Sequence, residues 1–467
     1  MINQKASFLI PKYISLIFHK FKNANYQIYL VGGAVRDLIQ KKPVQDWDFT
    51  TNAIPKKILK LFPKNSFYNN KFGTVTIIYP KNKIEITTFR SEKGYSDRRH
   101  PDKIIWGKTI EEDLARRDFT IDAIALKPIK EIASFPLVEK RQEKIDYLFA
   151  MIDPFEGKKD LKNKLIRAVG NPQQRFNEDA LRMLRAIRIS SQLGFIIEEN
   201  TFKAIQENVS LIKNISAERI RDELLKILSS PFAAEGFIFL RNSGLLKFII
   251  PELEKGYGLH QAKHHIYDVW THSIESLRYC PSKDPLVRFA TLLHDIGKPL
   301  VAKGKGEKRT FHNHEVVGAQ IAKKIAFRLK LSKKEIEKLW KLIRWHQFTV
   351  DERQTDKAIK RFIRKVGKEN LKDILDLRIG DRLGGGAKKT SWRLELFKKR
   401  LAGVQKQPLS LKDLKIDGYD VMNVLKIPPG PKVGKVLKII FNEVEENKEK
   451  NTREYLLARI PQIAKKI

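Results

Sequence analysis

The sequence lacks the features that would place it outside a reducing, aqueous compartment. Only one of its 467 residues is a cysteine, Cys280, which excludes an intramolecular disulfide and a zinc cluster of thiolates. No segment reaches the roughly eighteen apolar residues that a membrane span requires. The chain up to Leu30 is basic but has no arginine and no cleavage-site pattern, so we interpret it as a helix of the fold. These absences predict a cytoplasmic protein with no membrane partner and no disulfide-linked partner.

Acidic residues are also scarce relative to basic ones. The 91 lysines and arginines outnumber the 54 aspartates and glutamates and give a net charge of +37. This excess favours a polyanionic partner, first of all a nucleic acid, because neutralising phosphates supplies non-specific affinity. The alternative is a general solubility charge in a lysine-rich proteome. A chain of 467 residues with 42% hydrophobic residues predicts two to four domains.

A glycine pair followed by two aspartates is the strongest local signal. Residues 26–31 alternate weakly and end apolar, as a strand does, and run into Gly32 and Gly33. The backbone N–H groups of such a turn can approach a phosphate closely. Asp46 and Asp48 follow in an extended run, where residues two apart point to the same face. Two carboxylates and a phosphate-binding turn are what magnesium-dependent nucleotidyl transfer requires.

The stretch from Leu30 to Asp37, with Asp46-Trp47-Asp48, resembles the first motif of class II tRNA nucleotidyltransferases and bacterial poly(A) polymerases. These enzymes are a branch of the polymerase-β superfamily. The resemblance implies an α+β fold, in which a polymerase-β-like nucleotidyltransferase head, a mixed sheet with helices, precedes all-helical neck, HD and tail domains. It also implies that Asp46 and Asp48 are catalytic and bind Mg²⁺, and that Gly32, Gly33 and Arg36 bind the nucleotide.

We expect the head to span residues 1–150. Strand-like runs at 74–79 and 83–89 surround a Pro-Lys-Asn turn and predict a hairpin. Glu85 in the second run is either a third acidic residue for the metal site or an ordinary edge-strand charge. The polar run from Gly94 to Asp102 is typical of a loop near the site. Residues 128–150 are interpreted as an insertion without chemistry.

Two adjacent arginines precede an aspartate at Arg116, Arg117 and Asp118. Surface ion pairs are the usual fate of such residues. The run Arg-Arg-Asp-Phe-Thr nevertheless resembles the second motif of the family, which implies that the arginines hold the triphosphate and that Asp118 meets the ribose. The family usually has asparagine where this chain has Asp122. The extra negative charge is expected to weaken sugar or phosphate contacts.

The predicted neck, residues 151–250, contains two further family-like segments. Residues 153–161 resemble the third motif, a hinge element. The run 175–188 predicts an amphipathic helix with Leu181, Leu184 and Ile187 on its buried face. Its charged residues are spaced one turn apart and also fit a plain ladder of salt bridges.

One carboxylate and one guanidinium in this run match the edges of two bases. Cytosine and adenine present an amino donor beside a ring-nitrogen acceptor, whereas guanine and uracil present a carbonyl beside an N–H. An acid next to an arginine fits the first pattern and opposes the second. The run Glu-Asp-Ala-Leu-Arg also resembles the nucleotide-selecting motif of the family, which assigns selection to Asp179 and Arg182 and support to Arg185 or Arg175.

Eight of the ten histidines lie between His260 and His346, in the predicted third domain, residues 251–386. Such clustering indicates a metal site. The run Leu-Leu-His-Asp-Ile-Gly-Lys resembles the HD superfamily of metal-dependent phosphohydrolases. The resemblance implies that Lys298 meets a phosphate and that one or two divalent metals have the ligands His272, His294, Asp295, His314, His346 and Asp381. The ligands alone leave open whether the domain hydrolyses a substrate or only positions RNA.

The predicted tail spans residues 387–467. Gly384, Gly385 and Gly386 are expected to form a flexible joint in front of it. Beyond them, helices alternate with Gly/Pro turns, and the pattern is similar to the closing segment of bacterial tRNA nucleotidyltransferases. Glycines beside lysines suit an approach to an RNA backbone, and they equally suit simple helix connectors.

These segments together predict an enzyme that adds or repairs the 3′-terminal CCA of tRNA, with CTP and ATP as substrates, Mg²⁺ at the head and a divalent metal at the HD site. One alternative is a bacterial poly(A) polymerase, or an enzyme that adds only A or only the two C residues. Another is an HD phosphohydrolase whose head has become an RNA-binding module. A structural RNA chaperone is a third, against which the intact aspartate pair argues.

Overall fold

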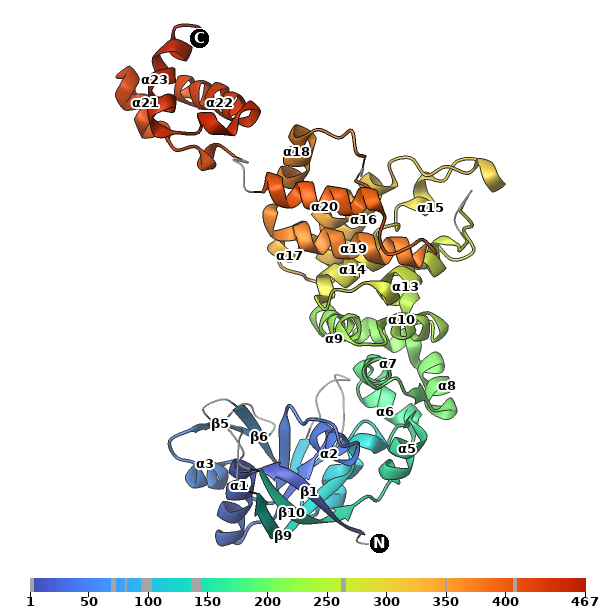
Figure 1. Ribbon diagram of the computed structural model, residues 1–467. Helices are drawn as coiled ribbons and strands as arrows, with labels where there is room; N and C mark the ends of the chain where they lie inside the picture. The colour runs from blue at the N-terminus through green and yellow to red at the C-terminus, as the bar shows by residue number, and fades with distance from the viewer. Residues whose placement is uncertain are drawn as a thin grey trace. The chain divides into compact units, whose positions relative to one another are not determined.

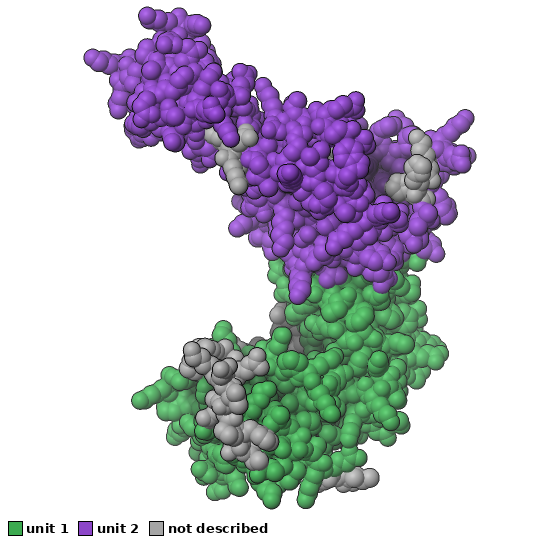
Figure 2. Space-filling view, viewed as in Figure 1, with its two compact units in different colours: residues 1–251 green, residues 252–467 purple. Residues whose placement is uncertain are grey.

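The computed structural model describes residues 4–68, 73–79, 82–93, 103–135, 144–261, 266–348, 351–405 and 410–467. The chain divides into two compact units, residues 1–251 and 252–467, which Figure 2 shows in different colours. None of the described helices combines the length and the apolar character that are needed to cross a membrane.

The first unit begins with an eight-stranded sheet in the order β1-β10-β9-β2-β3-β6-β5-β4. Its strands are β1 (Gln4–Pro11), β2 (Ile28–Val31), β3 (Trp47–Thr51), β4 (Ser66–Tyr68), β5 (Thr74–Tyr79), β6 (Asn82–Thr88), β9 (Ala125–Phe135) and β10 (Lys144–Ile152). β7 (Arg90–Lys93) and β8 (Lys103–Trp106) form a separate pair. Since β3 and β6 are parallel and the other neighbours in the large sheet are antiparallel, the sheet is mixed, as predicted.

Helices cover both faces of this sheet. The helix α1 (Lys12–Asn23) lies beside the strands of the sheet (Figure 1), and its apolar residues recur at helical spacing. The ring of Phe18 lies 5.8 Å from the rings of Phe49 and Phe149. Since successive side chains of a strand alternate between faces, Tyr29 and Val31 of β2 point to the opposite side. There they join an apolar cluster with α4 (Ile110–Ala115).

Three predictions for the head can be compared with these strands. The hairpin is confirmed, because β5 and β6 pair up to Tyr79 opposite Asn82. The opening segment contains α1 but also β1, a strand that the sequence reading missed. The interpretation of 128–150 as an insertion is wrong, because its described residues belong to β9 and β10, which pair with each other and with β1 and β2. The predicted loop at 94–102 lies outside the described residues.

Helices make up most of the rest of the first unit. They are α5 (Gly157–Asn163), α6 (Pro172–Glu178), α7 (Leu181–Leu193), α8 (Glu199–Asn208), α9 (Ala217–Ser229), α10 (Ala233–Asn242) and α11 (Leu246–Ile249). Leu181, Leu184 and Ile187 are buried, as predicted. The single helix predicted over 175–188 is wrong, however, because the chain breaks between α6 and α7 at Asp179.

The second unit is helical. Its main helices are α13 (Val269–Tyr279), α14 (Pro285–Leu293), α15 (Lys298–Val301), α16 (His314–Arg328), α17 (Lys333–Arg344), α18 (Asp356–Val366), α19 (Leu371–Gly384), α20 (Trp392–Val404), α21 (Gly418–Leu425), α22 (Pro431–Glu446) and α23 (Arg453–Ala464). The predicted flexible joint is wrong at its first residue. Gly384 ends α19 in close contact with α13, since a Cβ there would lie 2.4 Å from Ser276 N.

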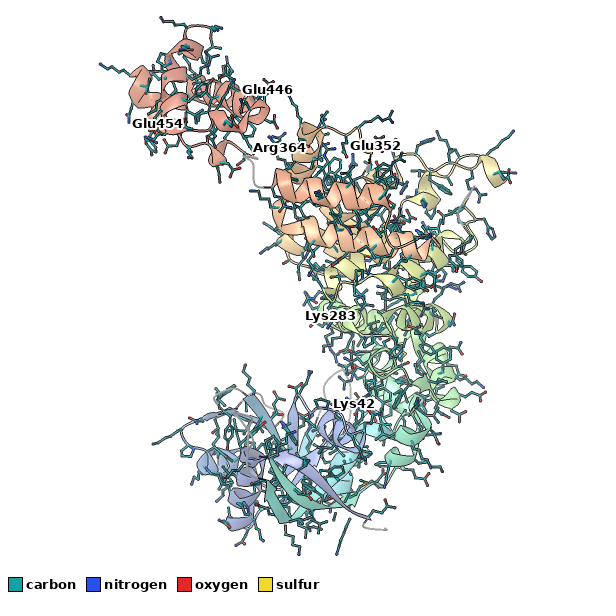
Figure 3. All side chains as sticks on the ribbon, viewed as in Figure 1. Lys42, Lys283, Glu352, Arg364, Glu446 and Glu454 are labelled. Carbon is teal, nitrogen blue, oxygen red and sulfur yellow. The ribbon has the colours of Figure 1, made fainter. Side chains whose placement is uncertain are left out.

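The helix α20, predicted to begin the tail, packs on α18. The ring of Phe397 lies 5.3 Å from that of Phe348 and 5.7 Å from that of Phe362, and Arg393 pairs with Glu352, which Figure 3 labels. The helices α21, α22 and α23 lie together (Figure 1) and share an apolar core between residues 414 and 463. The predicted domain limits remain predictions.

Candidate active site and metal centre

The glycine turn of the head connects β2 to α2 (Gly33–Ile39). Gly32 has a φ of +66°, a left-handed conformation that favours glycine. A Cβ at Gly32 would lie 3.3 Å from Arg117 Nη1 and 3.5 Å from Asp48 Oδ2. The turn therefore brings a guanidinium from one predicted motif and a carboxylate from another to the same point.

Acidic residues gather at the start of β3. Asp48 lies opposite Val31 of β2 and beside Glu85 of β6, while Asp46 precedes the strand and is exposed. Burial raises the pKa of Asp48, Arg117 lowers it, and repulsion from Glu85, Asp46 and Asp122 raises it, to about 6 overall. Carboxylate oxygens that repel one another in this way fit a divalent cation such as Mg²⁺. The position of Glu85 agrees with the proposed third acid, whose metal role remains a prediction.

The two predicted arginines share a buried carboxylate that the sequence reading did not single out. Asp113 is 0% exposed, and its Oδ1 accepts hydrogen bonds from Arg116 Nε at 3.0 Å and Nη2 at 2.7 Å. Arg117 Nη2 lies 3.3 Å from Asp113 Oδ2. Burial raises the pKa of Asp113, but the two guanidiniums lower it by more, so the pKa lies below its usual value. The spacing of three and four residues was visible in the sequence, whereas the burial was not.

Arg36 and Asp122 form an ion pair. Arg36 Nη1 lies 2.8 Å from Asp122 Oδ1, and Arg36 Nε lies 3.4 Å from Asp37 Oδ1. Arg117 Nη1 also donates to the backbone oxygen of Asp122 at 3.3 Å. The carboxylate that replaces the family's usual asparagine therefore neutralises a predicted triphosphate ligand.

Asp118 connects the head to the first turns of α7. Arg182 Nε lies 2.9 Å from Asp118 Oδ1, and Arg185 Nε pairs with Oδ2. Burial raises the pKa of Asp118, but Arg185 and Arg182 lower it to about 2. The predicted ribose ligand is thus held as a carboxylate by two residues of the predicted selector motif.

The two predicted selector residues have different partners. Asp179 accepts a hydrogen bond from Arg219 Nη2 of α9 at 2.7 Å, and Arg182 pairs with Glu178 as well as with Asp118. Arg219 was not predicted as a site residue, because it is forty residues from Asp179 in sequence. The arrangement fixes both predicted selector side chains with opposite charges.

The third predicted motif, residues 153–161, packs against the segment that follows Asp118 in the second motif. Asp153 accepts hydrogen bonds from the backbone N–H groups of Gly157 at 2.7 Å and Lys158 at 2.9 Å. A Cβ at Gly157 would lie 2.1 Å from Thr120 O, so only glycine fits this contact. Thr120 also donates to Asp160 at 2.7 Å. The segment that follows Asp118 is therefore packed directly on α5.

In the second unit, three histidine rings are oriented by the same kind of hydrogen bond to the backbone. The Nδ1 atoms of His294, His314 and His346 lie 2.7, 2.8 and 2.7 Å from the backbone oxygens three residues before them. A carbonyl only accepts, so each Nδ1 carries the proton. In the neutral form of each ring, Nε2 then presents a lone pair, as a metal ligand requires.

These nitrogens and two carboxylates form two groups of possible ligands. The first group is His272, His294 and Asp381, and the second is Asp295, His314 and His346; in each, the ligand atoms lie within 4.8 Å of one another. All six predicted ligands are thus brought together.

Asp295 bridges the two groups. Its Oδ2 lies 3.2 Å from His294 Nε2, and its Oδ1 lies 3.2 Å from His314 Nε2. His314 Nε2 is buried and makes no hydrogen bond within the described residues. Burial lowers the pKa of His294, but Asp295 and Asp381 raise it to about 10. Buried imidazoles facing excess carboxylate charge fit one or two divalent metals.

Two cations contact the carboxylates of this centre from outside. Lys298, 6% exposed, donates to Asp295 Oδ2 and to Gln261 Oε1, each at 2.6 Å. Arg378 Nη1 lies 3.1 Å from Asp381 Oδ2 and was not predicted. Lys298, the predicted phosphate ligand, therefore lies beside the predicted metal ligand Asp295.

Three family models match the chain in succession. They are the Poly A polymerase head domain over residues 28–167, the probable RNA and SrmB- binding site of polymerase A over residues 194–256, and the HD domain over residues 264–383.

Curated relatives of the chain are CCA-adding enzymes. One from Staphylococcus saprophyticus is 31% identical over 431 residues, which cover 92% of this chain and 92% of the relative. One from Lactobacillus helveticus is 44% identical over 225 residues, which cover 48% of this chain and 52% of the relative. The match thus spans about half the length of this second relative.

Solved structures match nearly the whole length of the chain. The CCA-adding enzyme of Bacillus stearothermophilus in complex with CTP is 27% identical, with a TM-score of 0.70 and coverage of 96% of both chains. The fold is shared with the Thermotoga maritima CCA-adding enzyme in complex with tRNA, at 20% identity and a TM-score of 0.56, over 97% of this chain and 99% of that chain. The predicted fold class, a polymerase-β-like head followed by helical regions, is confirmed.

Proposed function

This chain belongs to the family of CCA-adding enzymes, and from that premise we propose that it adds or repairs the 3′-terminal CCA of tRNA from CTP and ATP without a nucleic-acid template. The observation that carries the proposal is the meeting of Asp48 and Arg117 at the left-handed Gly32. A carboxylate that could bind a metal and a guanidinium that could bind a triphosphate then lie on either side of one glycine turn. The proposed substrates and the single cysteine assign this activity to the cytoplasm.

The chain's residues would position the two reactants. The 3′ hydroxyl of the RNA attacks the α-phosphate of the bound nucleotide, a phosphodiester bond forms, and pyrophosphate leaves. Asp46 and Asp48 would hold Mg²⁺, which when bound neutralises the developing charge and lowers the pKa of the attacking hydroxyl. The Gly32–Gly33 backbone and Arg117 would orient the triphosphate, with Arg36 and Arg116 adding positive charge.

Selection would take place where α6 meets α7. We propose that Asp179 and Arg182 meet the Watson–Crick edges of cytosine and adenine, held in place by Arg219 and Glu178. Asp118 would meet the ribose while it is held by Arg185. Fixed partners of opposite charge support this role, because a base edge is discriminated only by groups that cannot turn to suit the wrong base.

Three tRNA substrates test the proposal. Samples lacking CCA, CA or A are incubated with each nucleoside triphosphate in turn. We expect CTP to be added to the first two and ATP to the third, with no addition by Asp48→Ala. Uptake of UTP or GTP as readily as CTP and ATP would refute selection by Asp179 and Arg182. Repeated addition of ATP to any RNA end would instead indicate a poly(A) polymerase, and addition of only A or only C would indicate a partial enzyme.

A second activity is favoured by the six converging ligands of the HD centre. We propose that it hydrolyses a phosphate ester with one or two divalent metals bound by these ligands. The test is hydrolysis of a chromogenic phosphate monoester in the presence of Mn²⁺, Ni²⁺, Zn²⁺ or Mg²⁺, with Asp295→Ala as the inactive control. Hydrolysis that is identical in wild type and Asp295→Ala would contradict the assignment. Hydrolysis without any nucleotide addition would favour a phosphohydrolase whose head only binds RNA.

A further inference from the structure

The head contains a cavity of about 950 Å³ that the proposed reaction does not use. It is lined by residues of β1, β2, β9 and β10, of the segment that enters α4, and of α5. None of the residues at the Gly32 turn lines it. Its volume lies at the upper end of the range for ligand sites.

The cavity lies on the same face of the sheet as Asp48 but near the other end of β2. Val31 is opposite both Asp48 and Ala125, so these three side chains share a face. Tyr29 and Lys127, each two residues away along its strand, lie on that face too, and both line the cavity. Tyr29 and Ile110 also belong to the apolar cluster with Val31, which directly precedes Gly32 and does not line the cavity.

The wall of the cavity has an excess of positive charge. Five of its lining residues are lysines and three are acidic. Two of the acids are engaged locally, since Asp153 accepts from the first N–H groups of α5 and Glu156 pairs with Lys159 at 2.8 Å. Because Asp153 already occupies the start of α5, a compact anion finds no free helix terminus there.

Three of the lysines come from three different elements. Lys108 precedes α4, Lys127 is on β9 and Lys162 is on α5, and all three are exposed. Among the residues that the structure describes, no ion pair is formed by any of them. Separate point charges around a groove suit phosphates spaced along a strand better than one triphosphate, which convergent N–H groups and arginines bind.

We propose that this cavity binds the sugar–phosphate backbone of the RNA substrate, at a site distinct from the one where its 3′ end reacts. The proposal rests on the proposed function, which makes tRNA the RNA in question. Each lysine neutralises a phosphate and releases a counterion, so the site contributes affinity that depends on salt and not on sequence.

The experiment compares two triple variants of the full chain. Lys108, Lys127 and Lys162 are replaced by glutamine in one, and the exposed lysines of α3 (Pro55–Leu61), Lys56, Lys57 and Lys60, in the other. Both lose three charges from the head. The dissociation constant for tRNA lacking CCA is measured by filter binding between 50 and 200 mM salt, together with KM for CTP at saturating tRNA, and thermal melting confirms that each variant is folded.

We expect the cavity variant to bind tRNA about tenfold more weakly and to lose about two from the slope of log Kd against log salt, with KM for CTP unchanged. The α3 variant is expected to change Kd less than about threefold, and Lys162→Gln alone to lie between. Equal losses in both triple variants would overturn the proposal, and so would a raised KM for CTP with unchanged tRNA binding. If wild type adds no nucleotide to any tRNA, the proposed function has failed. If wild type extends tRNA but the two triple variants lose the same amount of tRNA affinity, only the proposal that the cavity binds RNA is refuted.

Discussion

The two metal sites proposed for this chain are built in opposite ways. At the head, Asp46 and Glu85 are exposed and Asp48 is partly buried. Asp46 and Asp48 lie at the start of β3, and Glu85 lies beside Asp48 on β6. In the HD centre, His272, His294, Asp295, His314 and His346 are each no more than 4% exposed. The rings of His294, His314 and His346 are already oriented by backbone carbonyls. One site is open and sparse, and the other is closed and rich in ligands.

This difference indicates how each metal is held. Mg²⁺ is usually bound through one or two carboxylates together with the phosphates of a substrate, so the head site is completed only when a nucleotide arrives. Six converging protein ligands instead make a site that is complete before substrate binds, and metal binding there stabilises the folded unit. The predictions below test this contrast, from the largest expected effect to the smallest.

Removing one head carboxylate should abolish nucleotide addition and nothing else. We expect Asp48→Ala to lower kcat/KM for CTP addition about 1000-fold, because the charge that neutralises the transferring phosphate is lost. Hydrolysis by the HD centre and its metal content should be unchanged. Glu85→Gln sharpens the test, with an expected loss of about tenfold if it is the third acid. Addition that persists in Asp48→Ala would contradict the head assignment.

Removing the metal of the HD centre should be visible in stability. We expect a chelator to lower the Tm of the second unit by about 5–15 °C in wild type, since a saturating ligand contributes about 2–4 kcal/mol. His294→Ala should show the low Tm with or without the chelator. Calorimetry and metal analysis check both, and the exposed His312 supplies the control His312→Ala. A chelator that leaves the wild-type Tm unchanged would show that the centre holds no structural metal.

Removing the partner of Asp179 should reduce the discrimination between CTP and UTP more than it reduces the rate of CTP addition. Arg219→Ala removes the partner of Asp179, so we expect the ratio of kcat/KM for CTP over UTP to fall about tenfold. The neighbouring Arg221→Ala, whose arginine pairs with Asp222, should leave the ratio unchanged. Equal ratios in wild type and Arg219→Ala would remove Arg219 from the selection mechanism.

Replacing Asp122 by asparagine should change the pH dependence of nucleotide addition. The metal-free pKa of Asp48 is raised to about 6, and Asp122 is one cause. Asp122→Asn therefore lowers the pKa of Asp48, and the carboxylate needed for metal binding persists to lower pH. We expect the acid limb of the pH profile of kcat/KM to move to lower pH, and KM for CTP to fall about threefold as Arg36 is released. Asp37→Asn is the matched control for the acid limb, because Asp37 also pairs with Arg36 but is not among the causes of the raised pKa of Asp48. An acid limb that does not move in Asp122→Asn would contradict the coupling.

Local patterns predicted much of both sites. The glycine turn, the aspartate pair and the hairpin follow from short-range rules, and the HD ligands follow from a motif in which one residue pair anchors the rest. Asp113 and Arg219 were missed as site residues, because burial and a partner forty residues away are not properties of a short segment. The strands β9 and β10 were missed because Pro128 and mixed charges look like a loop, although strand pairing tolerates them.

The sequence by itself determined the class of chemistry, since the residue types and their spacing specify a phosphate turn, a carboxylate pair and a histidine cluster. Only the tertiary structure decided which charges neutralise one another. Arg116 is held by Asp113, Arg36 by Asp122 and Asp179 by Arg219, and each choice depends on which elements pack together. Electrostatic partners are selected by distance in space and by burial, and neither quantity can be read from order along the chain.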